Sequence, residues 1–165
     1  MRAISIAKEF DIPNEDAARA TERMIAVSDG AGGGGVFADL WSKYLVDNLP
    51  EEPISGFQAF DVWIDSIWEL FYTDCERKAE KIGGMFLNKF YDEGSFATLV
   101  AVWKDGSWIS CGDSVAFCYN KKTGVLQHSF TRLADFNNPP YLINCKDPLN
   151  EKGFRKGKFK VDNSL

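Results

Sequence analysis

The order of hydrophobic and polar positions predicts that the first half of the chain contains two strands followed by two helices. Short apolar runs over 3–7 and 23–29 predict strands, and the proline and asparagine between them, in 11–17, are typical of a turn. Apolar residues then recur at helical spacing over 36–49 and over 57–82. The glycine pair that follows residue 82 is a typical helix stop.

The second half of the chain reads as strands. Residues 95–130 alternate between apolar and polar positions, with turn signals at Asp105-Gly106 and Thr123-Gly124. Residues 137–165 are loop-like except for a short strand near Phe159. Runs of helix followed by runs of strand favour an α+β fold with an antiparallel sheet. With no internal repeat or linker, residues 1–165 are expected to form a single domain.

Composition excludes several classes of function. The chain of 165 residues has a net charge of −5, so it does not suit general nucleic-acid binding, which needs a basic surface. It has no apolar run that could span a membrane and no signal peptide, so a cytoplasmic location is expected. The four cysteines lack zinc spacing and are expected to be reduced thiols. The single histidine gives no sign of a catalytic triad.

An aspartate followed by glycines, in the stretch IAVSDGAGGGG, is the feature most suggestive of chemistry. A dinucleotide site would need a βαβ unit, and a phosphate loop would need Lys-Ser/Thr where Val36-Phe37 stand. A plain turn loop stays open as an alternative. A third interpretation is a site for Mg²⁺ or Mn²⁺, with Asp29 and the Gly30 carbonyl as ligands. Glu15 and Asp16 would join them if the two N-terminal strands pair antiparallel.

Four motifs in order resemble the PP2C (PPM-type) metal-dependent serine/threonine protein phosphatases. They are NEDA at 14–17, IAVSDGAGG at 25–33, GSFATLVAVW at 94–103 and WISCGDSVAFCY at 108–119. The resemblance covers roughly residues 4 to 130. It implies an α-β-β-α sandwich of antiparallel sheets flanked by helices, incomplete at the C-terminus.

The resemblance also implies a site for two Mg²⁺ or Mn²⁺ ions, in which Asp16 and Asp29 are catalytic. Its metal ligands would be Asp29, Gly30, Glu15, Asp16 and Asp92. Lys8 is the nearest candidate for holding the substrate phosphate, in place of the arginine usual in the family. The implied substrate is a phosphoserine or phosphothreonine protein, in a signalling role.

The chain departs from the family pattern at several positions. Phe96 and Val115 replace a threonine and an arginine of the family motifs, and the family's later metal-binding aspartates are absent. Three hypotheses therefore remain: a phosphatase with an incomplete two-metal site, a pseudophosphatase that binds a phosphoprotein or partner without turnover, and an unrelated α+β binding domain. An uncovered sheet edge would favour a homodimer.

Overall fold

A computed structural model describes residues 2–7, 10–31 and 35–162. It contains three helices within this part of the chain: α1 (Ala38–Asp47), α2 (Phe57–Ile82) and α3 (Gly84–Glu93). The predicted helices over 36–49 and 57–82 are confirmed as α1 and α2. None of the helices in the described ranges is both long and apolar enough to cross a membrane.

The strands form one main antiparallel sheet and two small ladders. The main sheet has the order β1-β2-β4-β5-β9, and its strands are β1 (Asp16–Ala20), β2 (Met24–Asp29), β4 (Leu99–Trp103), β5 (Ser107–Cys111) and β9 (Phe154–Lys158). The ladders pair β3 (Phe96–Ala97) with β8 (Ile143–Asn144) and β6 (Phe117–Tyr119) with β7 (Leu126–His128). The predicted α+β class with an antiparallel sheet is confirmed.

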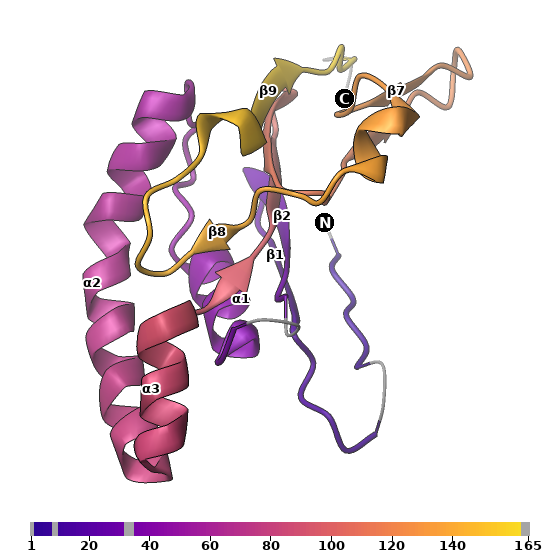
Figure 1. The fold of residues 1–165 in the computed structure, drawn as a ribbon. Coiled ribbons are helices and arrows are strands. Elements are labelled where there is room, and N and C mark those ends of the chain that lie inside the picture. The colour runs from indigo at the N-terminus through magenta and orange to yellow at the C-terminus, as the bar shows by residue number, and fades with distance from the viewer. Residues whose placement is uncertain (1, 8–9, 32–34, 163–165) are drawn as a thin grey trace.

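The three helices lie on one side of the main sheet (Figure 1). Strand β2 shows why the sheet has two different faces, because its residues alternate between buried and exposed. Met24, Ala26 and Ser28 are buried toward the helices, and Met24 and Ala26 belong to the same hydrophobic core as Trp41 and Leu45 of α1. The opposite face of the sheet is called the open face below.

Two tight turns appear where the sequence predicts them. Gly106 and Gly124 have φ values of +88° and +72°, which side chains with a β-carbon rarely adopt. They join β4 to β5 and β6 to β7. The predicted C-terminal strand is β9, which ends just before Phe159.

The predicted strand at 3–7 is wrong, because these residues form no strand in the structure. Ile4 and Ile6 are 83% and 78% exposed. An apolar alternation forms a strand only where a neighbouring strand shares backbone hydrogen bonds with it, and no strand of the described chain pairs with this segment. Helix α3 and strands β1 and β8 are structural findings that the hydrophobic pattern did not predict.

Prediction for the core. Leu45→Ala should lower the free energy of unfolding by about 2–5 kcal/mol, because the Leu45 side chain is fully buried and leaves a cavity. Leu70→Ala is the matched control, since Leu70 is 76% exposed on α2. Urea unfolding followed by tryptophan fluorescence measures both. Equal effects of the two substitutions would contradict the placement of α1 against the sheet.

Candidate metal site

Two carboxylates face each other across the first pair of strands. Strands β1 and β2 pair antiparallel with Asp16 directly opposite Asp29. Opposite residues of an antiparallel pair point to the same face, with β-carbons about 4.5–5.5 Å apart. Since Ser28, next to Asp29, is buried toward the helices, the alternation along β2 places both aspartates on the open face. The expected approach of Asp16 to Asp29 is found, but the strand that pairs with β2 is β1 and not the predicted strand at 3–7.

The NED turn fixes the start of β1 by local hydrogen bonds. The Asn14 side-chain oxygen accepts a hydrogen bond from the Asp16 N–H at 3.1 Å, which is the geometry expected of asparagine in a turn. The Glu15 carbonyl accepts two further bonds, from the Gly30 N–H at 3.0 Å and from the Ser42 hydroxyl of α1. The backbone just before Asp16 is therefore bonded both to α1 and to the residue that follows Asp29.

Gly30 is required by close packing. A β-carbon at this position would lie 2.5 Å from the Ala38 carbonyl oxygen and 2.8 Å from the Glu15 carbonyl oxygen. Both neighbours are backbone atoms that cannot rotate away. Access of the Gly30 carbonyl to an ion was the reason for this glycine that the sequence indicated. The structure adds that the strand meets the beginning of α1 here, which brings Asp29 close to the helix.

Thr98 holds the backbone of Asp29 on both sides. Its hydroxyl accepts a hydrogen bond from the Asp29 N–H at 3.0 Å, and its own N–H donates to the Asp29 carbonyl at 2.9 Å. Its carbonyl accepts a bond from the Ser28 hydroxyl at 2.6 Å. Thr98 is 2% exposed. We therefore regard it as a positioning residue, which the sequence analysis missed although it lies within the GSFATLVAVW motif.

The GDS turn supports the same threonine from the other side. The Ser114 hydroxyl lies 2.5 Å from the Thr98 hydroxyl. Gly112 has a φ of +92°, and a β-carbon there would approach a methyl carbon of Thr98 to 2.9 Å. The motif at 25–33 and the GDS turn, which are far apart in the sequence, thus both contact Thr98.

The remaining predicted site residues have different positions. Glu15 precedes β1 and is half-buried, with its backbone beside Gly30. Asp92 is exposed in the last turn of α3. Lys8 lies outside the described residues, as do the glycines at 32–34. Roles for Asp92 and Lys8 stay predictions.

The arrangement fits a hard cation with few protein ligands. Two like charges directly opposite each other destabilise a strand pair, and a divalent cation between them would remove the repulsion. Mg²⁺ commonly uses one or two carboxylates and keeps several waters. Over the described ranges, no group of three or more histidine, cysteine, aspartate or glutamate side chains could hold a metal ion. Asp16, Asp29 and the Gly30 carbonyl would be the protein ligands.

The cysteines do not offer an alternative nucleophile on the helical side. Burial raises the pKa of Cys75 and of Cys111 to about 12, and it also raises the pKa of Cys145. A thiol attacks a phosphate or carbonyl group as the thiolate, which needs a lowered pKa. All four cysteines are free thiols, as expected from their spacing.

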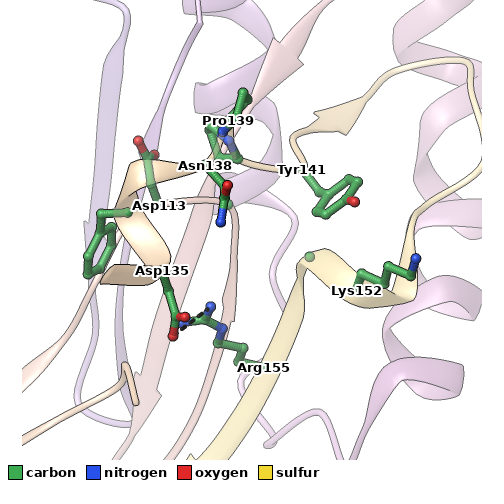
Figure 2. Close-up of a pocket in the computed structure, with 11 residues that line it drawn as sticks. Asp113, Asp135, Asn138, Pro139, Tyr141, Lys152 and Arg155 are labelled. Atoms are coloured by element: carbon green, nitrogen blue, oxygen red, sulfur yellow. Dashed lines mark ion pairs between the residues drawn. The ribbon is translucent and has the colours of Figure 1, made fainter. Parts of the chain in front are cut away.

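A polar cavity lies beside the GDS turn, at Gly112 and Asp113. It measures about 160 Å³ and lies among Asp113, Asp135 and Arg155 (Figure 2). Figure 2 shows the Arg155 guanidinium directed at the Asp135 carboxylate, at 3.7 Å, whereas the Lys152 amino group points away from the cavity. The cations that line the cavity are therefore directed at a carboxylate of the chain or at solvent.

The basic side chains near the C-terminus are engaged separately. Lys156 donates to the Ser55 carbonyl at 2.9 Å, and Lys158 forms an ion pair with Asp105 at 3.2 Å. Together with the Arg155 pair, these contacts spread the basic cluster along the edge strand β9. They favour a solvated strand edge over a surface for an acidic substrate.

The fold is similar to that of known serine/threonine phosphatases. No protein-family model and no curated protein matches the sequence. Among solved structures, the catalytic domain of the serine/threonine protein phosphatase PstP, in complex with two manganese ions, superposes with a TM-score of 0.57. The match covers 96% of this chain and 71% of that one at 16% identity. A bacterial serine phosphatase superposes over 94% of this chain and 69% of that one, at 18% identity. Its TM-score of 0.46 is too low to support any argument.

At 16% identity the PstP comparison establishes the fold alone. It confirms the predicted fold class, an α+β architecture of PP2C type with antiparallel strands and flanking helices. The chain thus has the fold of a serine/threonine phosphatase catalytic domain, and it places two opposed aspartates on the open face of its sheet.

Prediction for Thr98. Thr98→Val should lower the free energy of unfolding by about 1–3 kcal/mol, because the Asp29 N–H loses its acceptor in a partly buried place. Thr98→Ser keeps the hydroxyl and should be clearly less destabilising. Urea unfolding of the two variants gives the comparison. If Thr98→Ser loses as much stability as Thr98→Val, the methyl group matters as much as the hydroxyl, and the positioning role of the hydroxyl fails.

Proposed function

We propose that this chain is a PP2C-like, metal-dependent phosphatase acting on phosphoserine or phosphothreonine in proteins. The observation that carries the proposal is the direct opposition of Asp16 and Asp29 on a sheet of phosphatase fold. The manganese ions of the PstP complex support the choice of metal. Neither comparison tests activity in this chain.

Asp29 has the better-supported position of the two carboxylates. Its backbone is held by Thr98 at the end of a central strand pair, and Gly30 follows it without a side chain. Asp16 starts the edge strand β1 and is held by Asn14. When bound, a divalent ion supplies positive charge that neutralises a phosphate group and lowers the pKa of a nearby water. The chain's part is to hold the two carboxylates at a fixed separation, with the Gly30 carbonyl beside them.

A binding role without turnover is the second candidate. The absence of a three-residue metal cluster over the described ranges favours it, because two carboxylates and one carbonyl hold an ion less firmly than the ligand sets of most metal enzymes. In that case the same open face would bind a phosphoprotein or another partner. Metal binding and hydrolysis therefore need separate measurements.

Prediction for hydrolysis. The protein should hydrolyse p-nitrophenyl phosphate in the presence of Mn²⁺, and Asp29→Asn should reduce the rate by at least about tenfold, as expected for loss of a charged group in the transition state. Asp65→Asn is the control, because it makes the same charge change at an exposed position of α2. Hydrolysis that persists in chelator or in Asp29→Asn would contradict the proposal.

Prediction for metal binding. Mn²⁺ should raise the Tm of the wild-type protein, since a ligand that binds the folded state stabilises it. Asp16→Asn should abolish this rise. In chelator, the free energy of unfolding of the same variant should be higher than that of the wild type by about 0.2–1 kcal/mol, because one of two opposed like charges is gone. A Mn²⁺-dependent rise without hydrolysis would support the binding role. A rise that survives in Asp16→Asn would contradict the site itself.

A further inference from the structure

Strand β2 carries an apolar row on the same face of the sheet as Asp29. Ile25 and Val27 alternate with the buried residues of β2, so they lie on the open face, four and two positions before Asp29. At the usual rise of a strand, Val27 lies roughly 7 Å and Ile25 roughly 13 Å from Asp29. Their side chains are 46% and 41% exposed. An apolar surface therefore begins directly beside the candidate metal site.

This apolar surface is part of a groove of about 400 Å³. Residues of β2 and β4 form its floor, and the hairpin β6–β7 forms one wall. Figure 1 shows β7 on the side of the main sheet that faces away from the helices. Phe117 and Tyr119 of the wall are 58% and 60% exposed. None of the described residues that line the groove carries a charge, so the groove suits an uncharged, apolar occupant.

The GDS turn joins the groove to the candidate metal site. The Thr98 hydroxyl accepts a hydrogen bond from the Asp29 N–H at 3.0 Å and lies 2.5 Å from the Ser114 hydroxyl. Val115, the residue after Ser114, lines the groove. Asp29 and this end of the groove therefore share one support, the Thr98 side chain. The groove and the carboxylate pair are thus held in a fixed relation to each other.

We propose that the groove binds an extended segment of the phosphoprotein substrate, with apolar side chains at the second and fourth positions from the phosphorylated residue. The inference rests on the proposed function, because it places the phosphate beside a divalent ion at Asp16 and Asp29. Alternate side chains of an extended segment point to one side and recur at the spacing of those on β2. The second and fourth neighbours of the phosphorylated residue then lie over Val27 and Ile25.

Continuity with the candidate metal site selects this occupant. A substrate whose phosphate is held at the end of β2 continues from there in two directions, and one of them runs along β2 into the groove. Extended peptides that place alternate side chains in apolar pockets are a recurrent mode of recognition. A second sheet would need an open flat face, whereas the hairpin β6–β7 forms a wall on this one. The groove therefore suits a single extended segment.

The test measures kcat/KM with Mn²⁺ for four short peptides that contain one central phosphoserine. Two of them carry isoleucine at the second and fourth positions, one after the phosphoserine and the other before it. A third carries isoleucine at the first and third positions on both sides, and a fourth has serine instead. At least one of the first two should exceed the fourth by about tenfold, equal to about 1.4 kcal/mol. The third should match the fourth, and an equal gain for it would overturn the proposal.

Two variants test the groove itself. Ile25→Ser changes the floor and Tyr119→Ser the wall, and each should lower the ratio of kcat/KM between the preferred peptide and the serine peptide toward one. Because the ratio compares two substrates of the same variant, a change in the metal site cancels. Leu70→Ser, at a position 76% exposed on α2, should keep the wild-type ratio. Circular dichroism checks folding, and a ratio that neither groove variant changes would overturn the proposal.

The groove and the proposed function can fail separately. p-Nitrophenyl phosphate has no peptide chain to extend along β2, so its hydrolysis without any peptide preference would overturn the groove proposal and leave the phosphatase proposal intact. If no substrate is hydrolysed, fluorescence anisotropy with Mn²⁺ gives the Kd of the same peptides. The same preference in Kd would support the groove in a protein without turnover, and equal Kd values or no binding would overturn it. A wild-type dimer that Ile25→Ser dissociates would show that a second copy covers the groove, which would also overturn it.

Discussion

The antiparallel pairing of β1 with β2 is the constraint on which the rest of the structure depends. A shift of one residue in this register would turn every side chain of β1 to the other face. In the observed register Ala17 packs toward the core, Arg19 reaches the backbone carbonyls at the end of α1, and Asp16 stands opposite Asp29. The contacts that stabilise the pairing on the helical side therefore also bring the two carboxylates together on the open side.

The site is built from backbone contacts behind the carboxylates. Thr98 bonds to Asp29 through both its hydroxyl and its N–H, and the turn at Gly112 and Ser114 packs on Thr98. Thr98 is buried and its hydroxyl bonds to Asp29 and Ser114 are partly buried, so leaving one of these groups without a partner costs free energy. The phosphatase-like motifs act here as a structural unit. This packing role would be the same in a phosphatase and in a protein that binds a partner without turnover.

Much of the fold and the centre of the site could be predicted from sequence because they depend on local patterns. Helix α2 follows the predicted bounds because its apolar face repeats at helical spacing up to Gly83. The approach of Asp16 to Asp29 was expected from an antiparallel strand pair, although the strand that pairs with β2 is β1 and not residues 3–7. Thr98 could not be singled out in this way, because its role arises from contacts with residues about 70 positions earlier and 16 positions later in the chain. The exposure of Ile4 and Ile6 could not be predicted either, because it depends on whether another strand pairs with residues 3–7.

The central claim is that Asp16 and Asp29 hold a divalent cation together. Anomalous diffraction from crystals grown with Mn²⁺ tests it most directly, because the manganese signal locates the ion without assumptions about activity. The account predicts an anomalous peak beside the carboxylates of Asp16 and Asp29, which would hold the ion. Crystals of the folded protein with no peak at this pair, or with manganese only at other carboxylates, would contradict it.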